Sequence, residues 1–93
     1  MAQITQAGNS WSLTGEVVID TASALLEASK ILPITENTKI DFSGVTNIDT
    51  STISLIFEWR RRAQKENQSI QFVNLPANLN SLMQLYGVAD IIN

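Results

Sequence analysis

The chain has 93 residues, of which 44% are hydrophobic and 16% are charged, and its formal net charge is −3. This apolar fraction is too high for a disordered chain and is typical of one folded domain. Apolar residues occur only in short runs, which excludes direct membrane insertion. The N-terminus has neither the basic start nor the apolar stretch of a signal peptide. We therefore expect residues 1–93 to form a single cytoplasmic domain.

The same composition excludes several classes of function. The chain has no histidine and no cysteine, so it lacks an imidazole base, a thiolate nucleophile and the usual zinc ligands. We expect no catalytic residue, no metal, no cofactor and no small-molecule substrate. Nucleic acid is disfavoured because the domain is acidic and most of its basic residues lie in one short segment, residues 60–65. The charge therefore favours a protein partner.

Two strands and a helix are predicted in the first third of the chain. Residues 10–17 alternate apolar and polar side chains, which is typical of a half-buried strand. A shorter strand begins near Ile4, with Gly8 and Asn9 as the turn between the two strands. Asp20 is then predicted to be a helix N-cap, because apolar residues follow it at helical spacing. We expect Pro33 to end this helix.

Two further strands alternate with two helices in the rest of the chain. Residues 39–43 and 69–74 are predicted strands, and Gly44 is expected directly after the first of them. The longest helical pattern covers about residues 50–67, and a last helix runs from Asn78 as its cap to Gly87. The order β-β-α-β-α-β-α predicts an α/β fold, a mixed sheet covered by about three helices. The helix N-termini should then gather at the carboxyl edge of the strands, where partners usually bind.

The start of the long helix carries the most information about function. Asp49 or Thr50 is suited to accept the free N–H groups of the first helical turn, and a carboxylate there also meets the positive end of the helix dipole. Ser51 and Thr52 follow, so this start has more hydroxyl groups than capping requires. The Ile-Asp-Thr triplet of residues 48–50 also occurs at residues 19–21. One of these two copies can therefore be a helix cap and nothing else.

A helical wheel over the same helix separates a polar side from an apolar side. We call the polar side the polar ridge, and it consists of Thr50, Ser54, Glu58 and Arg61. Ser54 is small, so another protein could approach the start of the ridge closely. Glu58 can form a weak surface pair with Arg61 or Arg62. The opposite side is expected to be buried core, as is Trp11, and the arginine run is expected to lay its aliphatic stems on that core.

Several blocks of the sequence resemble the STAS domain, a family shared by sulfate transporters and anti-sigma factor antagonists. The first block is Asp-Phe-Ser-Gly-Val at residues 41–45, followed by Ile-Asp-Thr-Ser at residues 48–51 before an apolar helix. The second block resembles the closing helix of these domains: Leu79, Leu82, Leu85, Tyr86-Gly87-Val88 and Ile91-Ile92. The resemblance covers nearly the whole chain and implies a single STAS-like domain.

One branch of the family resembles this chain in further segments. Residues 57–61 (Phe-Glu-Trp-Arg-Arg), 72–77 (Phe-Val-Asn-Leu-Pro-Ala) and 85–88 (Leu-Tyr-Gly-Val) are similar to STAS subunits of Mla-type phospholipid transporters of Gram-negative bacteria. This resemblance implies a non-catalytic subunit that binds an MlaF-like ABC ATPase and, through it, an MlaE-like permease. Such a subunit is cytoplasmic and peripheral at the inner membrane, and its transporter maintains outer-membrane lipid asymmetry.

The resemblance also implies which residues form the site. The hydroxyl that is functional in the family corresponds to that of Thr50. In anti-sigma factor antagonists the matching position is a serine or threonine that a partner kinase phosphorylates. We expect the partner-binding site to comprise the start of the helix and the polar ridge: Asp49, Thr50, Ser51, Thr52, Ser54, Glu58 and Arg61. An anti-sigma factor antagonist that switches partners through phosphorylation of Thr50 stays open as the alternative. Thr52 departs from that pattern, because many antagonists have glycine there.

Overall fold

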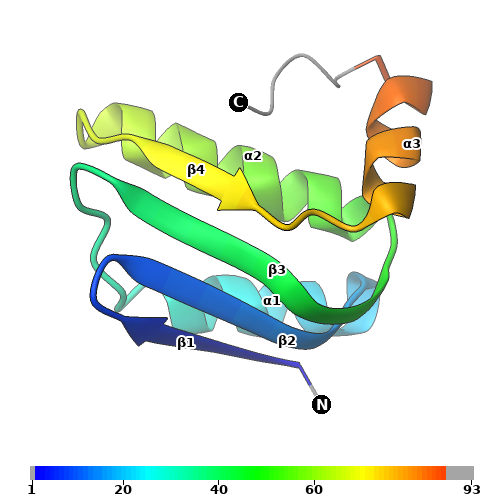
Figure 1. Cartoon of the computed structure of the whole chain (residues 1–93), viewed down its shortest axis with the longest axis horizontal. Coiled ribbons are helices and arrows are strands. Elements are labelled where there is room, and N and C mark those ends of the chain that lie inside the picture. The colour runs from blue at the N-terminus through cyan, green and yellow to red at the C-terminus, as the bar shows by residue number, and fades with distance from the viewer. Residues whose placement is uncertain (1, 88–93) are drawn as a thin grey trace.

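Four strands form one mixed sheet in the order β1-β2-β3-β4, with two helices on one face and a third at its end (Figure 1). The computed structural model describes residues 2–87. The elements follow one another as β1 (Gln3–Ala7), β2 (Ser10–Val17), α1 (Ile19–Ser29), β3 (Thr38–Ile48), α2 (Thr50–Lys65), β4 (Ile70–Val73) and α3 (Ala77–Leu85). This order confirms the predicted α/β fold with a mixed sheet and three helices.

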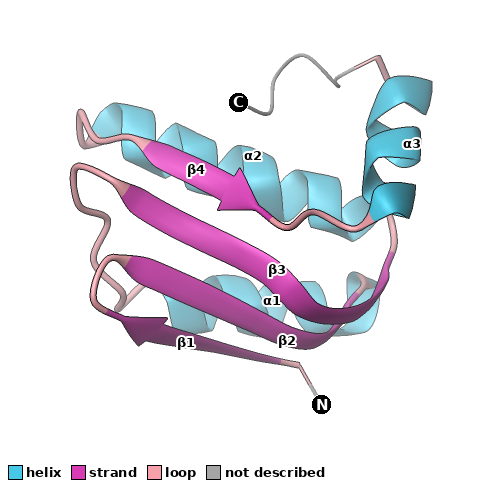
Figure 2. Ribbon diagram, in the orientation of Figure 1, coloured by secondary structure: helices cyan, strands magenta, loops and turns pink. Residues whose placement is uncertain are grey.

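The direction of the strands decides where the helices lie. β1 is antiparallel to β2, whereas β2, β3 and β4 are parallel. The parallel strands follow one another across the sheet in sequence order, so right-handed crossovers place α1 and α2 on the same face. Figure 2 shows both helices behind the strands, with α3 standing at the end of the sheet from which α2 begins. The starts of α1 and α2 therefore meet at the carboxyl edge of the parallel strands.

Two tryptophans organise the core between the sheet and the helices. Trp11 and Trp59 are buried and meet edge to face, with 5.9 Å between their ring centroids. The Trp59 Nε1 donates a hydrogen bond of 2.9 Å to the Ser29 hydroxyl. The Arg62 guanidinium lies 5.8 Å from the Trp11 ring centroid and donates to the carbonyl oxygens of Ser29 and Leu32. These contacts confirm the predicted core and fasten the end of α1 to α2.

Two predicted helix caps are wrong. The first residue of α1 is Ile19, so Asp20 lies inside the helix and Val18 takes the N-cap position. The Val18 N–H donates a hydrogen bond of 3.0 Å to the hydroxyl of Thr21 in the first turn. In α3 the N-cap is Pro76, and Asn78 lies inside the first turn.

The predicted ends of α1 and α3 agree with the structure. α1 ends at Ser29, before Pro33, and Gly87 follows α3 with a φ of 69°, the left-handed conformation expected at a helix C-terminus. Three residues of the C-terminal STAS pattern, Val88, Ile91 and Ile92, lie outside the described residues.

Gly44 does not follow a strand but lies inside one, because β3 continues to Ile48. The register of the β2–β3 pair shifts just before Thr14, which pairs with Gly44. A Cβ at Gly44 would lie 2.8 Å from the Thr14 Cγ2 and 2.9 Å from the Leu13 carbonyl oxygen. The close approach of the two strands therefore requires glycine at this position. The extension of β3 brings the start of α2 to the same edge of the sheet as the end of β2.

Replacing Gly44 by alanine should lower the free energy of unfolding by about 1–3 kcal/mol, because the added methyl group meets the backbone of β2. Urea denaturation of the purified domain measures this difference. Thr46→Ala is a matched control, since Thr46 is exposed on the same strand and should change stability by only about 0.5 kcal/mol. Equal stability of the two variants would show that the strands do not need glycine here.

Candidate functional site

The carboxylate of Asp49 lies where the starts of α1 and α2 meet. Its Oδ1 accepts a hydrogen bond of 2.8 Å from the Ser51 N–H, so Asp49, one of the two predicted candidates, is the N-cap of α2, and Thr50 is the first helical residue. Its Oδ2 accepts a bond of 2.9 Å from the N–H of Ile19, the first residue of α1. The first N–H groups of a helix lack partners within the helix, and α1 has no side chain at its own N-cap that accepts one. One carboxylate therefore serves two helices.

These two hydrogen bonds also determine the charge of Asp49. Burial by itself would raise the pKa of this carboxyl group, but the N–H groups of Ile19 and Ser51 stabilise its ionised form. The net result is a pKa below the usual value for aspartate. At neutral pH a negative charge therefore lies at the positive ends of two helix dipoles.

The polar ridge is accessible along α2. Thr50, Ser54 and Arg61 are exposed and Glu58 is half-buried. The Arg61 Nη1 donates to the Glu58 Oε1 at 2.9 Å, so Arg61 is the one of its two predicted partners that Glu58 pairs with, and Arg62 pairs with Glu66. Because 73% of the Arg61 side chain and 44% of the Glu58 side chain stay exposed, the pair contributes little to stability and can re-form with a partner. Within residues 2–87, no hydrogen bond engages the Thr50 hydroxyl.

Two other predicted site residues lie below this surface. Thr52 is completely buried, and its hydroxyl donates a hydrogen bond of 2.8 Å to the carbonyl oxygen of Val17 at the end of β2. Thr52 therefore fastens the start of α2 to the sheet and cannot contact a partner. Ser51 is half-buried, and its N–H donates to Asp49.

A groove of about 230 Å³ runs between α1 and α2 beside the ridge. Its walls combine small and apolar side chains from both helices with one carboxylate: Ile19, Ala22, Ser23, Leu26, Ser51, Ser54, Leu55 and Glu58. We call it the α1–α2 groove. Ser54 and Glu58 belong to both the groove and the ridge, so the two form one surface. Ile19 is 75% exposed, which leaves a large apolar side chain open at the end of the groove.

The sequence pattern did not predict that residues of α1 line this groove. The pattern that could have indicated it is the repeated Ile-Asp-Thr triplet at residues 19–21 and 48–50, which marks two helix starts that follow neighbouring strands. The two copies have different roles in the structure. Asp49 caps α2, whereas Asp20 caps nothing and Thr21 binds the backbone of Val18 and Glu16 instead.

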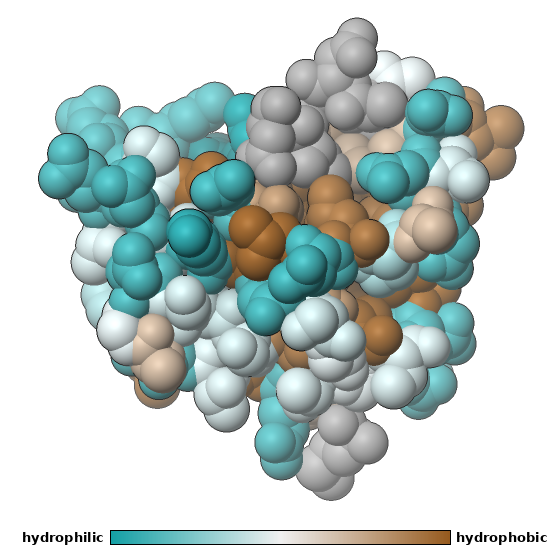
Figure 3. Space-filling model, in the orientation of Figure 1, coloured by the Kyte–Doolittle hydropathy of each residue, from teal (hydrophilic) through white to brown (hydrophobic). Residues whose placement is uncertain are grey.

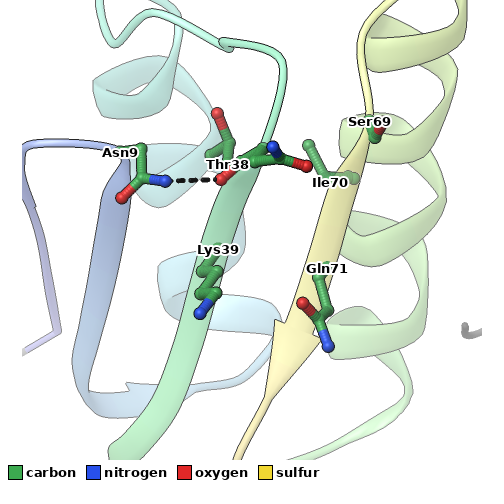
Figure 4. A pocket seen from close by; sticks show the side chains of 7 residues that line it. Asn9, Thr38, Lys39, Ser69, Ile70 and Gln71 are labelled. Carbon is green, nitrogen blue, oxygen red and sulfur yellow. Dashed lines mark hydrogen bonds between the residues drawn. The ribbon is translucent and has the colours of Figure 1, made fainter.

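A second hollow lies at the opposite edge of the sheet, at the amino ends of the parallel strands (Figure 4). It measures about 460 Å³ and is lined mainly by polar side chains: Asn9, Asn37, Thr38, Lys39, Ser69, Ile70 and Gln71. The Asn9 Nδ2 donates to the Asn37 carbonyl oxygen at 2.8 Å, and the Thr38 hydroxyl accepts from the Thr35 N–H. These side chains hold the loops, and the hollow lies away from the ridge.

Figure 3 views the sheet face that α1 and α2 leave open, which is largely hydrophilic or neutral with apolar residues across its middle. Asp41 stands between the buried residues Ile40 and Phe42 of β3, so its side chain points to this open face. The side chain of Asn74 and the N–H of Ser43 donate to its carboxylate, at 3.0 and 2.9 Å, and lower its pKa. These bonds join β3 to the residue that follows β4, so Asp41 has a structural role away from the ridge.

The chemistry of the site is that of a binding surface. Glu58 is the one carboxylate of the polar ridge, and Arg61 pairs with it. Across residues 2–87, no group of three or more potential metal-ligating side chains comes together. None of the helices in this range has the length and apolar character needed to cross a membrane. The surface offers hydroxyl groups, one exchangeable ion pair and an apolar groove.

Replacing Asp49 by asparagine should lower the free energy of unfolding by about 1–2 kcal/mol at neutral pH, because the amide offers one oxygen and no charge to two N–H groups. The folded-state pKa of Asp49 is lowered, so its contribution is complete above the unfolded pKa of about 3.9 and is lost as the pH falls through the folded-state value. The stability difference between the two proteins should therefore shrink below about pH 4.

Chemical denaturation of the wild type and of Asp49→Asn over a pH series from neutral to acid measures this difference. Asp20→Asn is the matched control, because Asp20 occupies the same place in the other triplet and is not a cap. A difference that stays constant down to the lowest pH would contradict the charged role of Asp49.

A known family resembles this chain in sequence, and solved proteins resemble it in structure. A family model described as "Mlab, STAS domain" matches residues 2–93. No curated protein matches the sequence. The structure is similar to the anti-sigma factor antagonist SpoIIAA in its unphosphorylated form, with 12% identity, a TM-score of 0.64, and coverage of 91% of this chain and 83% of that one. For the Bacillus cell fate determinant SpoIIAA in its phosphorylated form the identity is 12%, the TM-score 0.66, and the coverage 100% and 89%.

A further similar structure is that of Mglu, with 23% identity and a TM-score of 0.61. The match covers 81% of this chain and 20% of Mglu, so it concerns a small part of that protein. These identities show a shared fold and nothing finer. The family model, in contrast, matches the sequence over nearly its full length, and the chain therefore belongs to the STAS domain family.

Proposed function

We propose that this chain is a non-catalytic STAS subunit that binds and supports the ATPase of an Mla-type ABC phospholipid transporter. The observation that carries this proposal is the accessible surface formed by the polar ridge and the α1–α2 groove, with the exposed Thr50 at its start. The name Mlab in the matching family model supports the same branch. The subunit is then cytoplasmic, reaches the permease and the inner membrane through the ATPase, and serves a transporter that maintains outer-membrane lipid asymmetry.

The surface suggests how the ATPase is bound. Ile19 offers an exposed apolar side chain whose burial contributes about 1.5–3 kcal/mol, and the small Thr50 and Ser54 allow a partner backbone to come close. Glu58 and Arg61 can exchange their mutual pair for partners on the ATPase. A bound subunit shifts a conformational equilibrium only through its different affinities for the two states. We therefore expect it to bind the active arrangement of the ATPase more tightly.

Thr50 is a point of control in the proposed interface. Phosphorylation would add a charge of about −1.5 to −2 directly beside Asp49. A helix N-terminus can accept a phosphate group, but the N–H groups of Ile19 and Ser51 already bind the Asp49 carboxylate. The new charge would therefore repel Asp49 and any acidic group of a partner. Burying it against an apolar partner surface would also cost the hydration of the phosphate. We infer that modification of Thr50 weakens binding.

A second candidate function is that of an anti-sigma factor antagonist. The similarity to SpoIIAA in both its unphosphorylated and its phosphorylated form favours this alternative at the level of the fold. Thr50 has the free hydroxyl that such a switch requires. Genes next to that of this chain distinguish the two functions: a permease and an ATPase indicate transport, and a kinase with a sigma factor indicates signalling.

Co-purification of the tagged chain from its own cells tests the proposal. The wild type and Thr50→Ala should recover an ABC ATPase, whereas Thr50→Glu should recover much less, about tenfold, because of the charge placed beside Asp49. Glutamate is favourable in the first turn of a helix, so the variant should stay folded. Gln71→Glu adds the same charge on the opposite face of the sheet, since Gln71 is exposed and the next residue, Phe72, is buried in the core, and should bind like the wild type.

Each result decides between stated alternatives. Recovery of an anti-sigma kinase in place of the ATPase would assign the chain to the signalling branch. Equal recovery of the ATPase by all variants would keep the subunit assignment and remove Thr50 from the interface.

The α1–α2 groove gives an independent prediction. Ile19→Ala should weaken binding of the purified ATPase at least about tenfold, which corresponds to about 1.4 kcal/mol. It should leave the free energy of unfolding within about 0.5 kcal/mol, because the side chain is 75% exposed. Ile31→Ala is the matched control, since Ile31 is 87% exposed beyond the other end of α1. Titration calorimetry that gives equal affinities for the two variants would exclude the groove from the interface.

A further inference from the structure

The outer edge of β1 is open. β1 lies at one end of the sheet order, and in the part of the chain that the structure describes no strand pairs with its outer side (Figure 1). Its pairing with β2 runs from Gln3 to Ala7 without a bulge. Residues 2–9 contain no charged residue and no proline. Edge strands are usually protected from pairing with other chains by such residues or by a bulge, and β1 has none of these protections.

The hydrogen-bonding groups of this edge have a symmetric arrangement. Ala7 and Ser10 flank the two-residue turn, and such a closing pair exchanges both hydrogen bonds. Bonded pairs alternate along an antiparallel ladder, so the main-chain groups of Thr5 also face β2, whereas those of Ile4 and Gln6 point outward. The two outward-facing residues lie symmetrically about Thr5. A second copy in antiparallel orientation would pair Ile4 with Gln6 twice and place the two Thr5 residues opposite each other.

A hollow of about 550 Å³ lies beside this edge, between β1 and α1. Most of its lining is small or apolar, and its one charged residue is Asp20: Ala2, Gln3, Ile4, Thr5, Asp20, Thr21, Ala24, Leu25 and Ala28. Ala24 and Ala28 are exposed one helical turn apart, so a second helix could come close to α1. A two-fold axis that relates the two copies and runs perpendicular to the sheet would place their α1 helices on the same face of the joined sheet, side by side.

We propose that β1 and the adjacent side of α1 form a self-association surface, through which two copies join their sheets edge to edge about Thr5. The main-chain groups of Ile4 and Gln6 complete the ladder between the copies, and the α1 helices close over the hollow. A second copy fits this edge because its hydrogen-bonding pattern is self-complementary. Residues 2–9, the strand part of this surface, carry no charged side chain, and Asp20 is the one charged residue that lines the hollow.

The size of the surface predicts a weak dimer. Five residues of strand extend about 17 Å, and a sheet with one helix layer is about 20 Å thick. The contact then covers on the order of 340 Å² on each copy, which belongs to the class of small, transient interfaces. We expect a reversible dimer with a dissociation constant of about 10–500 μM.

This surface is separate from the polar ridge. The α1–α2 groove contains Ala22 and Leu26 of α1, whereas the hollow beside β1 contains Ala24 and Ala28. α1 therefore stands between the two surfaces, and the ridge stays open in the dimer. Thr50→Glu should accordingly leave self-association unchanged, whatever its effect on the ATPase.

Sedimentation equilibrium of the purified chain between about 10 μM and 1 mM tests the proposal. The wild type should change from monomer to dimer over this range. Thr5→Lys and Thr5→Glu should each stay monomeric, because two like charges meet at the axis. An equimolar mixture of the two variants should form the dimer again, since lysine then faces glutamate. Ser12→Lys is the matched control: Ser12 pairs with Thr5 one strand inward and is also exposed, so this variant should dimerise like the wild type.

Three outcomes would overturn the proposal. The first is a wild type that stays monomeric at the highest concentration. The second is a Thr5→Lys variant that dimerises like the wild type, which would place any association on another surface. The third is a mixture of Thr5→Lys and Thr5→Glu that stays monomeric while both proteins show the circular dichroism of the folded wild type.

Discussion

The candidate site depends on one carboxylate that two helices share. Asp49 accepts the N–H groups of Ser51 in α2 and of Ile19 in α1, and α1 has no capping side chain of its own. The relative position of the two helix starts is therefore determined by a charged group at their junction. At the other end of α1, Trp59 and Arg62 of α2 hold Ser29. Both walls of the α1–α2 groove are thus tied together at each end.

This sharing is possible because of the topology of the sheet. β2 and β3 are parallel neighbours, and the last residue of β2, Val17, pairs with Ile48 at the end of β3. The ends of β2 and β3 therefore leave the sheet at the same place, where Thr52 adds a buried hydrogen bond to the Val17 carbonyl oxygen. Gly44 allows β3 to lie close to β2 on the way to this edge. Backbone packing inside the sheet therefore positions the side chains of the candidate site on the surface.

α1 gives the domain two surfaces with different chemistry. On the side that faces α2, hydroxyl groups and the Glu58–Arg61 pair surround an apolar groove, which suits a partner with its own shape and charge. On the side that faces β1, an uncharged strand edge lies beside small side chains, which suits a symmetric contact. The first surface depends on side chains and the second mainly on the backbone. The two surfaces share no residue of α1, so the binding proposed for each does not depend on the other.

The sequence by itself determined the order of the elements, the buried face of α2 and a cap at either Asp49 or Thr50. These features depend on periodicity and on capping between near neighbours, which a single chain displays directly. Only the tertiary structure decided that Thr52 is buried, that Arg62 holds the end of α1 and that Ile19 joins the site. Each of these outcomes depends on a contact between segments about thirty residues apart, such as Thr52 with Val17 or Asp49 with Ile19. No local pattern records such contacts, because they exist only after β2 and β3 pair and bring the starts of two helices together.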